Sequence, residues 1–528
     1  MNFNKKLAVA VSGAVLLMAG QFALADSTTD IVDALVSKGV LTEEEGKLIT
    51  KGHTSQKEKT PTIKEKDGAF SLSSPNGKNS IQLTGRLHFD YRNNDTNNFG
   101  SDTSSYDYSR DPDSKSVGDH FEVRRARLGV KGRIGGIADY LLQGNIVGSR
   151  LMDEAWIDIN KYEPLGFKFG QFKQPVGLEQ LTSSNNIDFM ERSYVDQLVP
   201  AKKMGAMLHG EVTGFTYAGS IFQPNDDAKS ARDDKQSFAA RGTVNFAELM
   251  GNKEAVMHLG ISGWDQNYEV SPESSGNTSK AAESTTRSTI FSYRSGGRGL
   301  ANAFRMQVGG EACGSADYHC LSPNSAKVKS DALGLEAIGA YGPVKLQAEY
   351  LSAYYKAYGY TDTISADTDA WYVEGLWMLT GEKYADAYKK GAFGLVKPKN
   401  DFDGEGKNWG AIELGLRMDA FTVDNTQNTG TSAVSRFQGA INTLSNGVDE
   451  CKSVSGSCDK IKAGAKSYTA QLKWILNPNM LIKADYTHTK YDYAFNPIDL
   501  GASTARTTSL LKSISDEDLL MIRGQYMF

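Results

Sequence analysis

The stretch YTAQLKWILNPNMLIKADYTH, residues 468–488, alternates apolar and polar side chains on both sides of a short turn. One set of alternate positions carries Ala470, Leu472, Trp474, Ile482, Ala484 and Tyr486, and the other carries Gln471, Lys473, Lys483, Asp485 and Thr487. A period of two places these sets on opposite faces of a strand. The stretch therefore predicts a tight hairpin of two strands, each with one apolar face and one strongly polar face.

The same period recurs from residue 79 to residue 528. It is clear in SIQLTGRLHFDYR (80–92), QSFAARGTVNF (236–246), ANAFRMQV (301–308), PVKLQAEYLS (343–352) and the final MIRGQYMF (521–528). Tight turns alternate with long polar loops, which are Asn93–Asp119, Asn267–Ser288 and Asn425–Ala465. A soluble β-sandwich alternates too, but strands of about 10 residues with this pattern of connections are typical of a barrel in a membrane. We expect an all-β fold, a transmembrane antiparallel β-barrel, over residues 79–528.

The first 25 residues have the three parts of a secretory signal peptide. Lys5 and Lys6 form a positive region, Leu7–Ala19 is apolar, and Ala23-Leu24-Ala25 is a cleavage signal that predicts a mature start at Asp26. A membrane anchor is the alternative, but the apolar run is short. No later run of 18 apolar residues occurs, which excludes a helical membrane protein.

Residues 26–52 are predicted to form a short helical unit. Thr42 with Glu45 makes a capping box, and Gly39 and Gly52 are stop signals. The unit has too few apolar residues to fold alone, so it is either a short coiled coil that joins subunits or a loosely held extension, and we favour the coiled coil. Residues 53–78 are polar and predicted to be a linker.

Composition limits the remaining possibilities. Gly (53), Tyr (24) and Phe (22) are abundant beside 13 Pro, which fits many strands and turns. The pI near 5.9 argues against a nucleic-acid partner. The four cysteines, Cys313, Cys320, Cys451 and Cys458, form two C-x6-C pairs, for which two local disulfides are the simplest interpretation in an exported chain. A metal site is the alternative, but C-x2-C spacing is missing, and we expect no metal and no cofactor.

The stretch FEVRRARLGVKGR, residues 121–133, has a basic polar phase. Arg125, Arg127, Lys131 and Arg133 fall on one face, opposite an apolar face that would meet lipid. A cation on the lipid side would cost about 2–4 kcal/mol at the bilayer midplane, so these side chains should face the lumen. Glu122 and Arg124 are out of phase and should lie near a rim or at a bulge.

Other clear strands show the same preference for positive charge on the polar phase. Fourteen Lys or Arg stand there against seven Asp or Glu, whereas the whole chain has 58 against 63. The predicted lumenal cations include Arg86, Arg125, Arg127, Lys131, Arg133, Lys168, Arg241 and Arg305. Basic side chains in a pore favour anions. The alternative is that paired charges solvate the wall and neutralise one another.

Residues 171–203 interrupt the strand pattern. A segment of this length, folded into the barrel at about 175–203, would narrow the pore. Arg192, Lys202 and Lys203 are the predicted basic residues of this constriction loop, and four acidic residues in the same segment leave the local sign open.

Five segments together resemble one family of barrels. FEVRRARLGVKGRI, DEAWIDINKYEPLGFKFGQFKQPVGLEQLTSSNNIDFMERS, WYVEGLWMLTGE, NWGAIELGLRMDAF and LKWILNPNMLIKADY resemble the phosphate-selective porin O and P family of the bacterial outer membrane. The resemblance implies 16 strands, a homotrimer, an inward-folded loop, and arginines that guide anions toward a lysine-lined constriction. Arg125 and Arg127 match the basic strand of the family, and Lys202 and Lys203 match its constriction. Some members carry a periplasmic extension like the unit at 28–51.

The expected function is an outer-membrane channel for passive diffusion of phosphate or similar small anions, surrounded by outer-membrane lipid and lipopolysaccharide, with the N-terminal extension in the periplasm. A general or organic-acid porin with weak selectivity is the runner-up. A barrel lipase or protease would need a nucleophile beside a base, and no such motif is found. An adhesin tethered through the 28–51 helix is the third possibility. We expect no enzyme activity.

Overall fold

The structure is a computed structural model of the chain. It describes residues 32, 35–38, 40–49, 60–66, 68–95, 119–148, 151–224, 236–270, 288–299, 302–308, 326–358, 363–429, 436–438, 463–495 and 514–528. The predicted signal peptide and all four cysteines lie outside the described residues. Two compact units can be separated, one of residues 1–64 with 71–80 and one of residues 65–70 with 81–528.

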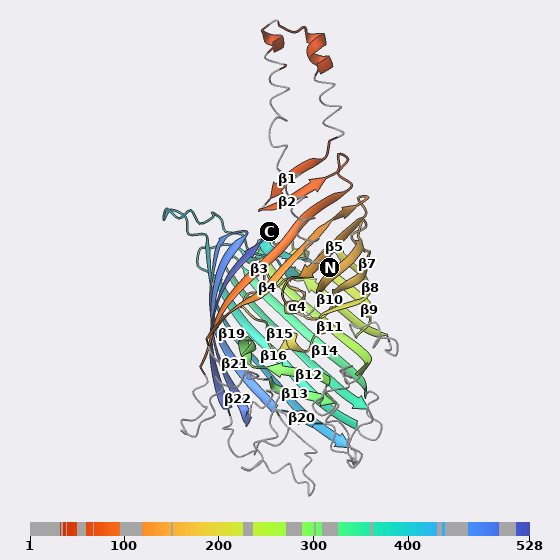
Figure 1. Ribbon diagram of the computed structural model, residues 1–528, viewed down its shortest axis with the longest axis vertical. Coiled ribbons are helices and arrows are strands. Elements are labelled where there is room, and N and C mark those ends of the chain that lie inside the picture. The colour runs from red at the N-terminus through yellow and green to blue at the C-terminus, as the bar shows by residue number, and fades with distance from the viewer. Residues whose placement is uncertain are drawn as a thin grey trace, which may run out of the picture. The chain divides into compact units, whose positions relative to one another are not determined.

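The second unit is a closed antiparallel barrel of 16 strands, so the predicted fold class is confirmed (Figure 1). Its strands are β3 (Ser80–Asp95), β4 (His120–Ile134), β5 (Ala138–Asn145), β6 (Met152–Ile159), β7 (Gly166–Lys173), β8 (Lys202–Val212), β9 (Phe215–Phe222), β10 (Ser237–Asn245), β11 (Ala255–Val270), β14 (Ala326–Tyr341), β15 (Val344–Tyr358), β16 (Thr363–Met378), β19 (Ala411–Thr429), β21 (Ala463–Asn477), β22 (Met480–Phe495) and β23 (Ile514–Met527). Pairing of β23 with β3 closes the ring, with Tyr526 opposite Leu87. Closure leaves no free strand edge in the hydrocarbon, which is the condition for a sheet to span a membrane.

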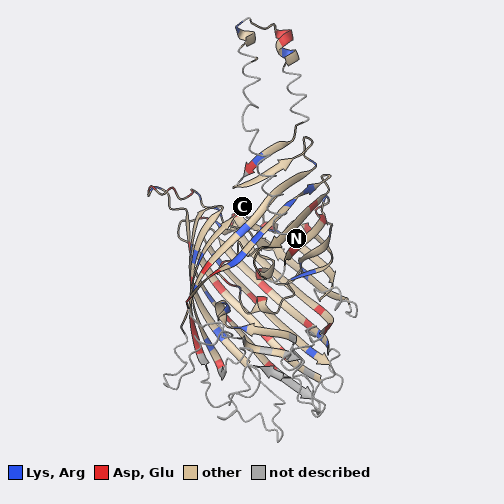
Figure 2. Cartoon of the chain, in the orientation of Figure 1, with Lys and Arg blue, Asp and Glu red and all other residues tan. Residues whose placement is uncertain are grey.

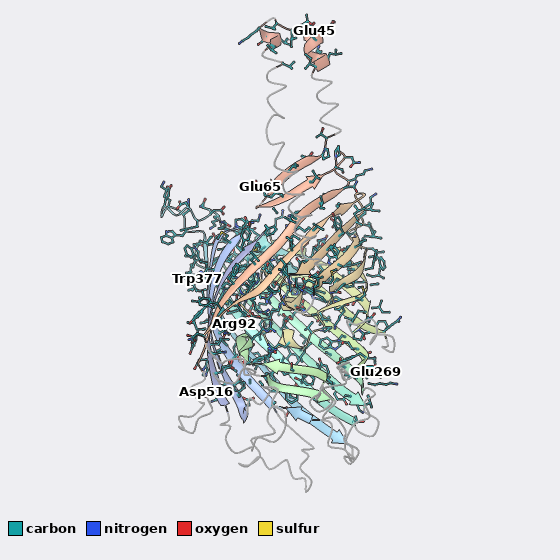
Figure 3. All side chains as sticks on the ribbon, in the orientation of Figure 1. Glu45, Glu65, Arg92, Glu269, Trp377 and Asp516 are labelled. Carbon is teal, nitrogen blue, oxygen red and sulfur yellow. The ribbon has the colours of Figure 1, made fainter. Side chains whose placement is uncertain are left out.

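Alternation along the strands separates lipid from lumen as the sequence predicted. In the hairpin of β21 and β22, Lys473 faces Lys483 inside, and both are almost fully buried. Leu472 and Tyr486 on the other phase are close to half exposed. Figure 3 shows the same contrast between Arg92, which is buried, and Trp377, which is 53% exposed on the outer face.

The barrel wall is uneven. The strands β5–β10 have 8 to 11 residues, and we call them the short wall. The other ten strands have 14 to 19 residues, and we call them the long wall.

A separate three-stranded sheet corrects one prediction. It consists of β12 (Ser288–Arg294), β13 (Asn302–Val308) and β20 (Arg436–Gln438), with η5 (Gly296–Arg298) between the first two. The stretch ANAFRMQV, with Arg305, was predicted as a barrel strand, and it is β13 of this sheet. Its apolar phase, Phe304 and Met306, is buried in a cluster with side chains from the inner face of the barrel, so alternation alone did not distinguish this core from lipid.

The remaining elements are short. They are α4 (Leu178–Leu181), η2 (Val195–Gln197), α5 (Phe246–Leu249), η6 (Tyr384–Ala387), β17 (Tyr388–Lys389) and β18 (Ala392–Phe393). The segment with η6, β17 and β18 contributes Tyr384 and Phe393 to a second buried cluster, which also contains Leu178 and Phe189.

The first unit contains a helical stretch at 43–49. The predicted capping box is present: the backbone N–H of Thr42 donates to Glu45 Oε2 at 2.9 Å, and the N–H of Glu45 donates to Thr42 Oγ1 at 3.2 Å. The linker prediction for 53–78 missed two five-residue strands, β1 (Thr62–Lys66) and β2 (Ala69–Ser73). Strands this short have too few alternating positions for the pattern to be recognised in the sequence. Among the described residues, no helix has both the length and the apolar character needed to cross a membrane.

Candidate functional site

A polar chamber of about 670 Å³ lies inside the barrel, between the strands β3–β8 and residues 174–201, which we call the inner loop. Eight cations line it: Arg86, Arg125, Arg127, Lys131, Lys173, Arg192, Lys202 and Lys203. Three acids line it: Asp153, Glu154 and Asp196. Eight minus three leaves a formal charge of +5 on the lining, in a chain of net charge −5. Figure 2 shows the basic residues along this side of the barrel.

A shift of phase in β4 brings two adjacent arginines to the same side. Phe121 and Val123 are exposed on the outer face, yet both Arg124 and Arg125 point inward to Glu191 of the inner loop. Arg124 Nε lies 2.7 Å and Arg125 Nη2 lies 3.9 Å from carboxylate oxygens of Glu191. The alternation of β4 thus shifts by one residue next to Arg124, which with Glu122 was predicted to lie near a rim or at a bulge.

A second shift of phase, in β6, brings two adjacent acids into the chamber. The register of β5 with β6 breaks between Gln143 and Gly144, opposite Asp153. Asp153 forms ion pairs with Lys202 and, at 3.1 Å, with Arg127. Glu154 lies 3.1 Å from Lys202. These two carboxylates partly neutralise the cationic lining.

Lys173 is a chamber residue that the sequence interpretation missed. Its Nζ donates to the carbonyl oxygens of Gln180, at 2.6 Å, and Thr182, at 3.0 Å, and so holds the inner loop to β7. Strict alternation would place Lys168 and Lys173 on opposite faces because they are five residues apart. Lys173 is the last residue of β7, where the chain turns into the inner loop, and Gly170 before it has φ of +121°, a conformation that glycine permits.

Side chains of the long wall hold the backbone of the inner loop. Glu349 accepts hydrogen bonds from the N–H groups of Leu178 and Glu179 at 2.8 and 2.7 Å. Lys483 Nζ donates to the carbonyl oxygen of Ile187 at 2.5 Å, and Arg523 Nη1 donates to that of Met190 at 2.7 Å. Both cations are on the polar phase of their strands, and both bind the backbone of the inner loop. They lie under the loop rather than in the chamber.

Acidic residues of the inner loop neutralise further cations of the wall. Asp188 lies 2.6 Å from Lys345 and 3.4 Å from Lys473. Glu191 is surrounded by four guanidiniums, which belong to Arg92, Arg124, Arg125 and Arg523. The loop therefore divides the basic residues into an anchored group on the long wall and a group that faces the chamber.

Two acids of the inner loop have opposite pKa shifts. Burial raises the pKa of Glu179 to about 7, and only part of that effect is offset by Arg417, whose Nη1 lies 3.2 Å away. Burial acts in the same direction on Glu191, but its four guanidinium neighbours hold its pKa well below the usual range. Glu191 is thus a fixed negative charge, and Glu179 titrates near neutrality.

Apolar side chains fill the space beside the chamber. Tyr293 of β12 stacks on Phe421 with ring centroids 4.0 Å apart, and Phe291 stacks on Tyr355 at 4.4 Å. Tyr194 of the inner loop meets Phe421 edge-on at 4.9 Å. This packing fills the lumen beside β15 and β19, so the chamber under β3–β8 is a polar space beside an apolar core.

A second cavity of about 490 Å³ continues the chamber, because Glu154 and Lys173 line both. Lys168 and Arg241 line it, but both are paired. Lys168 lies 3.3 Å from Asp158, and Arg241 lies 2.6 Å from Glu336. Its lining has four Lys or Arg against five Asp or Glu, so the excess of positive charge ends with the first chamber.

The predicted site residues are thus divided among several places. The structure brings seven of them together in the chamber: Arg86, Arg125, Arg127, Lys131, Arg192, Lys202 and Lys203. Lys168 and Arg241 lie in the second cavity. Arg133 pairs with Asp139 at 3.0 Å and lines neither, and Arg305 lies on β13. The cysteine pairs are outside the described residues.

Comparison with known proteins gives a family match over most of the chain. The model of the family described as phosphate-selective porin O and P matches residues 81–528. Porin O of Pseudomonas aeruginosa is 25% identical over 352 residues, which is 65% of this chain and 69% of that protein.

Three solved structures are similar to the chain at low sequence identity. OmpT of Vibrio cholerae has a TM-score of 0.45 at 9% identity, over 85% of this chain and 98% of that one. An anion-selective porin from Comamonas acidovorans has a TM-score of 0.44 at 10% identity, over 85% and 100%. The channel DcaP of Acinetobacter baumannii has a TM-score of 0.41 at 12% identity, over 85% and 97%.

Proposed function

The chain belongs to the phosphate-selective porin O and P family, and from that premise we propose that its chamber is the selectivity site of a passive channel for phosphate and similar small anions. The protein is an anion-preferring channel of the bacterial outer membrane. The lining of the chamber has a formal charge of +5 in a chain of net charge −5. This observation is the main support for a preference for anions over cations. Guanidinium groups suit phosphate because their planar donors match its oxygens.

Selection in this channel rests on charge and hydrogen-bond donors. Arg86 Nη1 is held by Ser184 Oγ at 2.7 Å, and Arg127 Nε by Asn145 Oδ1 at 2.8 Å, so their positions are set before an anion arrives. Solutes cross without chemical change, and the chain acts as a pore and not as an enzyme. We also propose that copies assemble as a trimer and that the N-terminal extension lies in the periplasm.

A weakly selective channel for organic acids is the second candidate. Asp153 and Glu154 favour it, because they neutralise Lys202 and part of the charge of Arg127 inside the chamber. A carboxylate solute would meet the same donors as phosphate, so the local geometry accepts both.

Planar-bilayer recording separates these possibilities. In a KCl gradient we expect an anion-selective reversal potential, and millimolar phosphate should block chloride current. A cation-selective potential would disprove the channel proposal. An anionic current that phosphate does not reduce, but that short carboxylates do, would select the second candidate.

A further inference from the structure

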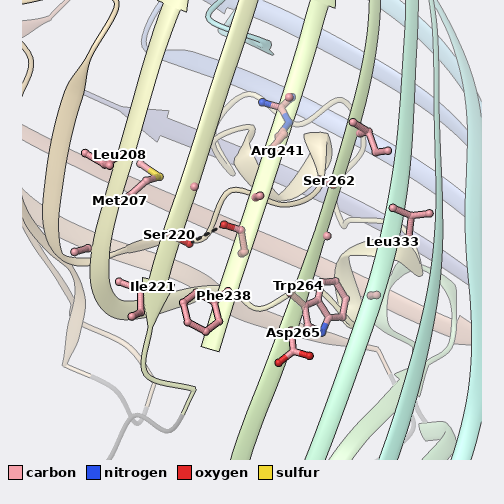
Figure 4. Close-up of a pocket in the computed structure, with 18 of the residues that line it drawn as sticks. Met207, Leu208, Ser220, Ile221, Phe238, Arg241, Ser262, Trp264, Asp265 and Leu333 are labelled. Atoms are coloured by element: carbon pink, nitrogen blue, oxygen red, sulfur yellow. Dashed lines mark hydrogen bonds between the residues drawn. The ribbon is translucent and has the colours of Figure 1, made fainter. Parts of the chain in front are cut away.

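The second cavity opens at the end of the barrel where tight turns join the strands. The short wall encloses it on the side of the lumen, while the outer face of the same strands carries an apolar groove of about 1010 Å³ (Figure 4). Glu163, in the turn between β6 and β7, lines the cavity and is exposed, and the side chain of Lys390, which also lines it, is 73% exposed. The tight turns of outer-membrane barrels face the periplasm, so this cavity lies on the periplasmic side of the chamber.

Apolar side chains fill the neighbouring space at this end of the lumen. Tyr384 and Phe393, from the segment with η6, β17 and β18, pack in one buried cluster with Val256, Leu376 and Ile475 from the inner face of the long wall. A dry cluster of this kind excludes ions, because an ion would lose its water there without gaining a partner. In the part of the chain that the structure describes, the second cavity is therefore the polar passage between the chamber and the tight turns.

The cations of the second cavity are already held by other groups. Lys168 and Arg241 form the ion pairs described above, and Lys173 donates to three carbonyl oxygens of the inner loop. The fourth cation, Lys390, lies 3.3 Å from Glu211. An anion that enters from the chamber thus meets positive groups whose charge is largely compensated.

Glu163 is a lining carboxylate for which the described residues provide no ion pair. Five acids against four Lys or Arg leave a formal charge of −1 on the lining, with histidine counted as neutral. Two partners stand behind the lining, Arg133 beside Asp139 and Glu336 beside Arg241, and they add one charge of each sign. The excess negative charge therefore remains, and Glu163 places it at the mouth of the cavity.

We propose that the second cavity is a valence filter and that Glu163 is the residue that determines its strength. On the way out of the chamber an anion passes from a lining of +5 to a lining of −1. The energy of an ion near a fixed charge is proportional to the charge of the ion, so a dianion is opposed twice as strongly as a monoanion. The channel passes singly charged anions, including singly charged phosphate, and retards dianions. This inference rests on the proposed function and adds the class of solute.

Substitutions of opposite sign at the mouth test the filter. Glu163→Gln changes the formal charge of the lining from −1 to 0, Lys390→Gln changes it to −2, and the double variant returns it to −1. Both side chains are exposed, so the barrel should fold, and heat-modifiable migration in gels verifies this. Glu405→Gln is the matched control, because Glu405 is an exposed acid in a turn at the same end of the barrel and lines neither cavity.

Sulfate and perchlorate are suitable probes, since both are tetrahedral and they carry two charges and one. Reversal potentials of the full-length protein in planar bilayers, with sulfate on one side and perchlorate on the other at about 0.1 M, give the ratio of their permeabilities. We expect Glu163→Gln to raise the sulfate-to-perchlorate ratio about two- to fivefold and Lys390→Gln to lower it by a similar factor. The double variant should cancel the two shifts, and the control should match the wild type.

The direction of the shifts separates charge from structure. A disturbed mouth would move both single variants in the same direction, and that result, or no shift in either variant, overturns the filter. A KCl gradient across the same bilayers tests the channel itself. If the wild type is anion-selective there, a failed sulfate test removes the filter alone, whereas a cation-selective wild type overturns the proposed function and the filter with it.

Discussion

At the scale of single residues, the charges that neighbour each arginine in the chamber determine how strongly that arginine attracts anions. Arg125 and Arg127 face it from β4, and only Arg127 has an acidic partner within the chamber, Asp153 at 3.1 Å. Arg125 shares Glu191 with three other guanidiniums at the edge of the inner loop. The pair therefore contributes two of the eight positive charges of the lining.

Replacing both by neutral residues tests this contribution. Arg125→Gln with Arg127→Gln lowers the formal charge of the lining from +5 to +3. Removing a charge a few ångströms from an ion in a wet site changes its energy by about 0.5–1 kcal/mol, so we expect the chloride-to-potassium permeability ratio to fall about two- to tenfold. The reversal potential in a KCl gradient measures it. Arg133→Gln is the control, and an unchanged ratio in the double variant would place the selecting charges elsewhere.

Glu179 should make the inner loop sensitive to pH. Its pKa is raised from 4.5 to about 7, so the folded state disfavours the charged form. The destabilisation is absent below the unfolded pKa, grows as pH rises from about 4.5 to about 7, and is complete above that, with a limit of about 3 kcal/mol. We expect amide hydrogen exchange over 178–199, corrected for intrinsic rates, to be slower at pH 5.5 than at pH 8. Glu179→Gln should reduce this difference, and equal protection at both pH values in the wild type would contradict it.

Glu191 supplies the contrast. Because its pKa is held well below the usual range, its ion pairs persist from neutral pH down through pH 5. Glu191 therefore adds no pH dependence to the loop over this range.

At the scale of elements, β12, η5 and β13 fill part of the lumen beside the inner loop. Arg92 Nη1 donates to the carbonyl of Gly297 at 3.1 Å, and Gln197 of the inner loop accepts from the N–H of Arg294 at 2.7 Å. These contacts and the stacked rings of Phe291 and Tyr293 seat this hairpin inside the lumen. It is a second inward element, and it contacts the inner loop at Gln197.

Exchanging residues 288–308 for a Gly/Ser sequence of equal length should open the dry side of the lumen. We expect single-channel conductance to rise about twofold, since water would replace the aromatic core, with weaker but still anionic selectivity because the basic strands remain. Tyr293→Phe keeps the ring and is the control. Unaltered conductance after the exchange would mean that the hairpin does not limit the ion path.

At the scale of the whole molecule, the contrast between chamber and chain predicts a salt dependence. The chamber is positive while the complete chain is negative, so selectivity comes from a local field that ions screen. The Debye length falls from about 10 Å at 0.1 M to about 3 Å at 1 M. We expect anion preference to be strong in 0.1 M KCl and to weaken several-fold in 1 M KCl, measured as reversal potentials at a fixed concentration ratio. Selectivity independent of salt would indicate selection by size or by direct coordination instead.

The sequence by itself determined the barrel. Few folds fit an exported chain that alternates apolar and charged side chains with a period of two. In a membrane the apolar side chains must face lipid and the charged ones the lumen, as in the hairpin at 468–488 and the final strand. It also predicted an excess of positive charge in the lumen and a loop folded into the barrel at about 175–203. Seven of the predicted basic residues meet in one chamber for this reason.

Only the tertiary structure decided which cations are available. Shifts of phase at Arg124 and Asp153 change which neighbours face inward, and strict alternation cannot show them. Lys483 and Arg523 have the same pattern in the sequence as Arg125, but the inner loop covers them and uses them as anchors. The stretch with Arg305 alternates like a wall strand because an apolar core inside the barrel and lipid outside it select the same side chains. Alternation reports only that one face is dry, and long-range packing determines what that face meets.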